Sequence, residues 1–64
     1  MKIVHLNAVR RNEWIFKVSL NQNKGHIMVF AYNEAMLWSQ IQFFYSENSA
    51  RDWIEYLVLQ SENL

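Results

Sequence analysis

The chain of 64 residues contains no cysteine and no proline, and Gly25 is its only glycine. Without cysteine it can form neither a disulfide bond nor a zinc site with thiolate ligands. One glycine cannot supply the glycine-rich loop with which nucleotide-binding proteins cradle phosphate groups. The sequence also has no Pro-, Gly- or Ser-rich run of the kind that links domains, so we expect residues 1–64 to form a single compact domain.

Long hydrophobic runs are absent as well. The uninterrupted apolar stretches are only a few residues long, whereas a helix needs about 20 apolar residues to span a bilayer. The first residues lack the basic start, the apolar run and the small-residue cleavage site of a secretory signal. We therefore expect a soluble, cytoplasmic protein that does not bind membranes.

Residues that carry catalytic or metal chemistry are sparse. The two histidines, His5 and His26, lie far apart in the chain and form no HxxxH or HxH motif, so we expect no metal and no cofactor. The serines lie in polar turns or strands and show no pattern of a nucleophile beside a base. Asp52 and Glu55 are placed by their spacing on the solvated side of a helix. The sequence thus predicts a protein that is not an enzyme.

Hydrophobic residues, by contrast, make up 52% of the chain, and three Trp, three Tyr and four Phe are among them. An enclosed aromatic side chain buries about 150–250 Å², and a domain of about 60 residues hides only about 60% of its surface on folding. We expect some rings to remain at the surface, where grouped aromatic side chains form docking surfaces. The alternative is a crowded core in which Tyr and Trp edges are half-buried.

Alternation of apolar and polar residues predicts three strands, over residues 2–8, 13–20 and 26–32. The connecting segments, Arg10-Arg11-Asn12 and residues 21–25, are polar, and Gly25 suits a hairpin turn. The middle strand has the clearest pattern. One of its faces carries Trp14, Phe16, Val18 and Leu20, and the other carries Ile15, Lys17 and Ser19.

Residues 33–45 fit two structures. A helix would begin at Asn33 and carry one apolar stripe. A strand would direct alternate side chains to opposite faces, the two sets being Ile41, Phe43, Tyr45 and Gln40, Gln42, Phe44. We favour the strand, because the aromatic triplet at 43–45 prefers strands and Asn33-Glu34-Ala35 supplies a turn before it. The helix remains the alternative.

The last part of the chain predicts a helix. Ser49-Ala50-Arg51-Asp52 matches a capping box, in which the serine side chain bonds to free backbone N–H groups. The residues that follow form one apolar stripe at helical spacing, made of Ala50, Trp53, Ile54, Leu57 and Val58. Leu59 and Tyr56 fall outside or at the margin of this stripe. We expect the polar tail from Gln60 to Leu64 to fray.

Together these elements predict an α+β fold: a small antiparallel sheet of three to four strands in meander order, with one C-terminal helix packed on one face. The other face of the sheet then stays uncovered. If Trp14 and its row point to the helix, Ile15, Lys17 and Ser19 point away from it, and we expect Phe44 or neighbouring aromatic residues beside them.

Charge is sorted along the chain. Residues 1–32 hold five basic residues and one acidic residue, for a net charge of +4, and residues 33–64 hold the reverse, for −4. Because surface potential selects partners, the acidic helix indicates a protein that binds a basic surface of another protein. Compact, cysteine-free proteins of this kind suggest a phage-encoded regulator or inhibitor of a nucleic-acid-processing enzyme. The candidate interface residues are Asp52, Glu55, Tyr56, Leu59 and Phe44.

The same features support two further hypotheses. A homodimer would cover surplus aromatic surface and supplement a thin core. A module that binds single-stranded nucleic acid would instead use the basic side of the sheet, where cations and aromatic rings can grip a strand; its candidate residues are Arg10, Arg11, Lys17 and Lys24. The sequence lacks the patterns of RRM and KH modules, so we treat nucleic-acid binding as the alternative and protein binding as the leading hypothesis.

Overall fold

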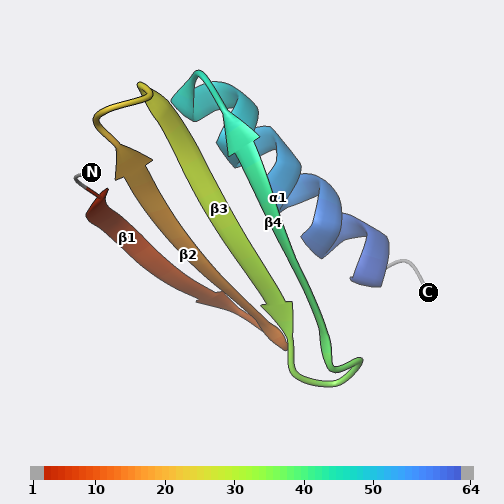
Figure 1. The fold of residues 1–64 in the computed structure, drawn as a ribbon. Coiled ribbons are helices and arrows are strands. Elements are labelled where there is room, and N and C mark those ends of the chain that lie inside the picture. The colour runs from red at the N-terminus through yellow and green to blue at the C-terminus, as the bar shows by residue number, and fades with distance from the viewer. Residues whose placement is uncertain (1–2, 63–64) are drawn as a thin grey trace.

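The computed structural model describes the backbone of residues 3–62 and the side chains of residues 6–61, which form a four-stranded antiparallel sheet followed by one helix (Figure 1). The strands lie in the sheet in chain order, β1-β2-β3-β4. This confirms the predicted small α+β fold with a meander sheet and a C-terminal helix. The elements are β1 (Ile3–Arg11), β2 (Trp14–Asn21), β3 (His26–Asn33), β4 (Trp38–Phe44) and α1 (Glu47–Glu62).

The first hairpin is tighter than the sequence predicts. We expected Arg10-Arg11-Asn12 to interrupt the chain after residue 8, but β1 continues through Arg11, which pairs with Trp14. Only Asn12 and Glu13 form the turn, and Asn12 has a φ of 56°. A two-residue hairpin turn needs positive φ, and asparagine adopts it more readily than most residues. A bulge between His5 and Asn7 shifts the register of β1.

The other two hairpins are each held by a buried asparagine at the end of a strand. The Oδ1 atom of Asn21 accepts hydrogen bonds from the backbone N–H groups of residues 23 and 24, at 3.1 and 3.2 Å. That of Asn33 accepts them from residues 35 and 36, both at 3.0 Å. In the β2–β3 turn, Gly25 takes the expected positive φ of 68°. These side chains supply the turn chemistry in a chain without proline.

Residues 33–45 contain a strand, as we favoured, and the helix alternative is wrong. β4 pairs with β3 from Trp38 to Phe44. The turn before it ends at Leu37, which has a φ of 51° and a side chain that is 79% exposed. Positive φ is uncommon for a leucine, so the hairpin places a strained and apolar residue at its tip.

The helix begins earlier and ends later than predicted. Its cap is Ser46, whose Oγ accepts the backbone N–H of Ser49 at 3.2 Å, so the predicted cap lies inside the first turn. Ser46 offers the same side-chain chemistry three residues upstream, and the helix gains one turn by using it. At the other end α1 extends to Glu62, so the expected fraying from Gln60 is wrong for Gln60 and Ser61. Residues 63 and 64 lie outside the described part.

The core lies between α1 and one face of the sheet. Phe16 and Val29 are fully buried there, and the predicted helix stripe packs on them through Ala50, Leu57 and Val58. α1 contacts β3 and β4, so it covers the β4 side of the sheet (Figure 1). No helix within residues 3–62 is long and apolar enough to cross a membrane.

Candidate functional site: an open sheet face and an exposed helix row

The face of the sheet that points away from α1 is uncovered. Residues that pair directly across antiparallel strands point to the same side, and successive residues alternate. The register therefore directs one set of β2, β3 and β4 side chains away from the helix. We call this set the open face: Ile15, Lys17, Ser19, Met28, Phe30, Tyr32, Ser39, Ile41 and Phe43.

The open face is mostly apolar. Ile41 and Phe43 are 53% and 54% exposed, and Met28, Phe30 and Tyr32 are half-buried beside them. A continuous apolar surface of this kind on a small domain is a candidate interaction site. The exposure of these side chains agrees with the expectation that one small core cannot enclose every aromatic ring.

One end of the open face carries an aromatic cluster around His26. The His26 ring lies 4.9 Å from the ring of Phe43 and 6.2 Å from that of Tyr45, with edge-on geometry in both cases. His26 is 9% exposed, and its Nδ1 is the one buried side-chain N or O atom in the described part of the chain that has no hydrogen-bond partner. The cluster thus extends the open face with aromatic surface rather than with charge.

Phe44 does not belong to the open face, which corrects the expectation that it points outward. It lies on the helix side of β4, where its ring packs 5.8 Å from that of Trp53. Because side chains alternate along a strand, its neighbour Phe43 takes the outward position. Phe43 shares its alternation set with Ile41, and which of the two sets faces α1 is decided by packing rather than by the sequence pattern.

On the helix, three predicted residues form one outward row. Asp52, Tyr56 and Leu59 are separated by four and three positions, which places them on one side of α1. All three are exposed, and Tyr56 and Leu59 are each 54% exposed. We call these residues the helix row. It lies on the side of α1 opposite the stripe that packs on the sheet.

Glu55 lies beside the helix row but is engaged within the molecule. Arg11 of β1 donates two hydrogen bonds to its carboxylate, at 2.8 and 3.5 Å. The hydrogen bond and the charge of Arg11 lower the pKa of Glu55 below its ordinary value of 4.5. The charge of Glu55 is thereby paired with one from the basic half of the chain.

The four candidate cations for nucleic-acid binding do not form one patch. Arg10 pairs with Glu34 at 2.7 Å, and Arg11 pairs with Glu55 on the helix side. Lys17 lies on the open face, and Lys24 lies in the β2–β3 turn, at the opposite end of β2 from the two arginines. Both arginine charges are thus compensated by acids from the second half of the chain, which reduces the charge asymmetry that the sequence displays.

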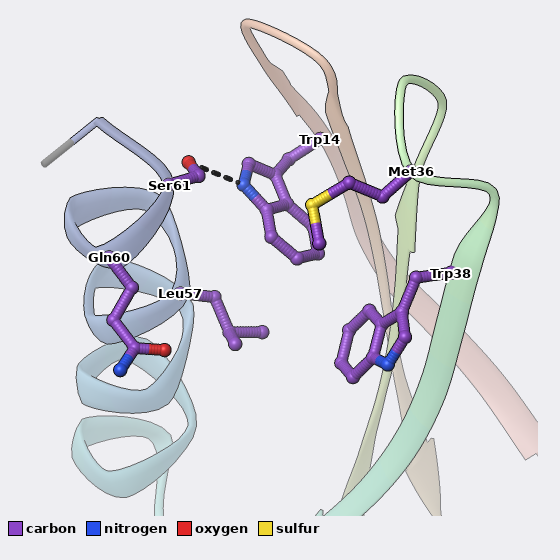
Figure 2. Close-up of a pocket in the computed structure, with 6 residues that line it drawn as sticks. All are labelled: Trp14, Met36, Trp38, Leu57, Gln60 and Ser61. Atoms are coloured by element: carbon purple, nitrogen blue, oxygen red, sulfur yellow. Dashed lines mark hydrogen bonds between the residues drawn. The ribbon is translucent and has the colours of Figure 1, made fainter. Parts of the chain in front are cut away.

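A hollow of about 350 Å³ separates the β3–β4 turn from the C-terminal part of α1 (Figure 2). Trp14 and Trp38 meet there edge to face, with ring centres 5.6 Å apart. The Nε1–H group of Trp14 donates to Ser61 Oγ at 3.0 Å, which fixes the ring. Met36 and Leu57 complete the apolar lining. No lining side chain is titratable, so the hollow can accept an apolar group but offers no acid or base.

A second hollow, of about 340 Å³, lies between β1 and α1. It exists because α1 covers β3 and β4 and leaves the helix side of β1 uncovered. Val9, Val18 and Ile54 contribute apolar surface to it, and Arg11 and Glu55 also line it. The Arg11–Glu55 ion pair joins its two walls. Sequence reasoning missed both hollows, since their linings come from segments far apart in the chain.

The side chains that could bind a metal are dispersed in the described part of the chain. Within residues 6–61, no three His, Asp or Glu side chains come close enough together to hold a metal ion. Ser46 and Ser49 bond to each other at the start of α1, and Ser61 is bonded to Trp14. No family model matches the chain, and no curated protein or solved structure matches it.

Proposed function

We propose that this chain is a non-enzymatic module that binds another protein through the helix row. The observation that carries this proposal is the exposure of Tyr56 and Leu59 beside Asp52, on a helix whose opposite side is buried in the core. Tyrosine is enriched among residues that dominate protein interfaces. An aromatic and an aliphatic side chain fixed on a packed helix lose little conformational freedom on binding.

The charges around the helix row favour a basic partner. Asp52 and Glu47 are exposed on α1 and, unlike Glu55, are in no ion pair among the described side chains. Negative charge at the rim of an interface speeds association with a positive surface and rejects acidic ones. Enzymes that process nucleic acids present such positive surfaces. A regulator or inhibitor of such an enzyme, encoded by a phage, is therefore the role that we propose.

Purified nucleases and polymerases with basic substrate channels provide the direct test, by surface-immobilised binding at low and high salt. We expect a partner from this class to bind, and the double variant Tyr56→Ser, Leu59→Ser to weaken binding by about two orders of magnitude because both apolar anchors are lost. Gln60→Ala, an exposed change next to the row, is the matched control and should bind normally. Unchanged binding by the double variant would reject the helix row as the site.

Single-stranded nucleic acid is the second candidate partner. One observation favours it: Lys17 lies on the open face directly beside Phe30, its partner in the β2–β3 register, and cation–aromatic pairs of this kind hold single strands. Fluorescence anisotropy with labelled oligonucleotides across a salt series tests it. Binding that weakens steeply with salt would support the second candidate. Absence of binding at low salt would eliminate it.

A further inference from the structure

We infer that the open face is the interface between two copies of this chain, which pair sheet against sheet and leave α1 on the outside of each copy. This inference goes beyond the proposed function, because it concerns the face of the sheet opposite the helix row. It assigns the open face to a second copy rather than to a foreign protein. Three observations support this inference: the charge of the open face, the shape of the chain and the order of its strands.

The charge of the open face suits a copy of itself. In a homodimer with a two-fold axis, the same surface of each copy meets, so an unpaired charge near the axis is brought close to its own equivalent. Among the side chains that define the open face, Lys17 is the only charged one. At its margin, Arg10 is paired with Glu34 at 2.7 Å. A surface with so little charge approaches its copy with little repulsion and with little charge to desolvate.

The single chain is elongated and has a helix on only one side of its sheet. Its extents are 38 × 20 × 15 Å, and its Cα radius of gyration is 11.9 Å. A compact chain of this length has a radius of gyration of about 10.7 Å. The long axis raises the radius of gyration, and within the described residues one face of the sheet has no covering layer. A second sheet packed about 10 Å away would give the open face the partner layer of a β-sandwich.

The area of the open face is modest for a specific dimer. Its three strands, spaced about 4.8 Å apart and about 25 Å long, cover roughly 360 Å² in projection. Two such faces cover roughly 720 Å², and the relief of the side chains raises the accessible area above its projection. Specific interfaces start at about 1,200 Å² of total buried surface. The dimer would thus lie at or below the lower end of this range, so we expect a weak, concentration-dependent equilibrium.

The strand order also allows a dimer in which the two Lys17 side chains do not face each other. A two-fold axis that runs along β3, between the two sheets, brings β2 of each copy opposite β4 of the other. Lys17 then faces the surface formed by Ile41 and Phe43 of the second copy, instead of facing its own equivalent. A lysine stem can lie over apolar surface while its ammonium group reaches the solvent at the rim.

The inference can be tested by charging two pairs of equally exposed side chains. Ile41→Lys, Phe43→Lys places charges on the open face, and Tyr56→Lys, Leu59→Lys places them on the helix row; all four native side chains are 53% to 54% exposed. Light scattering and sedimentation equilibrium measure mass over a concentration series. We expect the native chain to reach twice its 7.8 kDa mass. The open-face variant should dissociate on the order of a hundredfold more readily, and the helix-row variant should dimerise normally.

Circular dichroism shows whether each variant is folded. If the open-face variant fails to fold, the native protein still decides the question. NMR shifts that change with concentration should then map to Met28, Phe30 and Phe43. A monomer at every concentration, a dimer broken only by the helix-row variant, or shifts confined to α1 would overturn the inference. Loss of partner binding by helix-row variants in an intact dimer bears on the proposed function alone.

Discussion

At the scale of single residues, two buried asparagines stabilise the turns that follow β2 and β3, in a chain without proline and with one glycine. Asn21 and Asn33 are 5% and 1% exposed, and each side-chain oxygen accepts two backbone N–H groups of the turn that follows. Removing such an acceptor breaks two part-buried hydrogen bonds to the backbone of the turn at once. These two positions therefore secure the hairpins that bring β3 beside both of its neighbours.

Replacing Asn33 by alanine tests this argument. We expect Asn33→Ala to lower the free energy of unfolding by about 2 kcal/mol, because two backbone N–H groups lose their acceptor near a buried site. Urea unfolding at one fixed protein concentration measures the change. Gln22→Ala, in the exposed part of the β2–β3 turn, is the control and should have little effect. Equal effects from the two substitutions would show that Asn33 is not a structural acceptor.

At the scale of elements, the position of α1 depends on its two ends and on one contact with β1. Its first turn is capped by Ser46. Its last turn is tied to the sheet, since Ser61 accepts the indole N–H of Trp14 at 3.0 Å. Between them, Glu55 reaches Arg11 across the hollow beside β1. These contacts hold the helix over β3 and β4 and so fix the direction of the helix row.

The cap assignment leads to a comparison of two serines. Ser46→Ala should lower the free energy of unfolding by about 1 kcal/mol, because the cap oxygen of the helix is lost. Ser49→Ala should cost less, because alanine keeps the backbone N–H that Ser46 accepts and loses only the exposed hydrogen bond from the Ser46 hydroxyl to Ser49 Oγ. Chemical unfolding followed by circular dichroism measures both. A larger effect at Ser49 would show that Ser49 is the helix cap, as the sequence pattern predicts.

The Glu55 contact should make stability depend on pH in a defined direction. Arg11 lowers the pKa of Glu55 below 4.5 in the folded chain. The contribution of this contact is therefore fully present above about pH 4.5 and is lost as the pH falls through the lowered pKa. We expect Glu55→Gln to be less stable than the native chain at neutral pH. This difference should shrink toward zero in acid.

Unfolding curves of the native chain and Glu55→Gln across the acid range measure this difference. Added salt should also reduce it at neutral pH, because both partners are partly exposed and their charges are screened. The matched control is Glu47→Gln. Glu47 lies in the first turn of α1 and takes part in neither of the two ion pairs found among the described residues. A difference between native and Glu55→Gln that grows as the pH falls would contradict the assignment.

At the scale of the whole molecule, the two candidate surfaces lie on opposite sides of the protein. Figure 1 shows α1 on one side of the sheet; the open face is on the other side of the sheet, and the helix row is on the side of α1 that points away from the sheet. The two surfaces can therefore be occupied together. A sheet-to-sheet dimer would carry its two helix rows on opposite outer surfaces, available to two separate partner molecules.

This arrangement predicts the stoichiometry of a partner complex. We expect two partner molecules per dimer, because neither helix row is covered by the open-face interface. Sedimentation velocity of the complex with its purified partner measures this ratio, and the Ile41→Lys, Phe43→Lys variant should give a complex of one copy with one partner. A single partner per native dimer would show that the helix rows are not independent sites.

The sequence by itself determined the local features of this protein. Alternation of side chains predicted three strands, the strand preference of residues 43–45 favoured a fourth over a helix, and helical spacing predicted the stripe of α1, because each signal depends only on neighbouring residues. The composition also indicated surplus aromatic surface. The exposure of Tyr56 and Leu59 followed from their angular position on the helix, which needs no knowledge of the sheet.

Only the tertiary structure decided which side chains form the exposed surfaces and which distant residues meet. Phe43 rather than Phe44 points outward because α1 covers one particular face of β4, and the covered face is chosen by packing across the whole sheet. Arg11 and Glu55 meet because β1 and α1 are brought together in space, although they are far apart in the chain. Such contacts depend on register and on which layers meet, and neither is set by the residues next to them in the sequence.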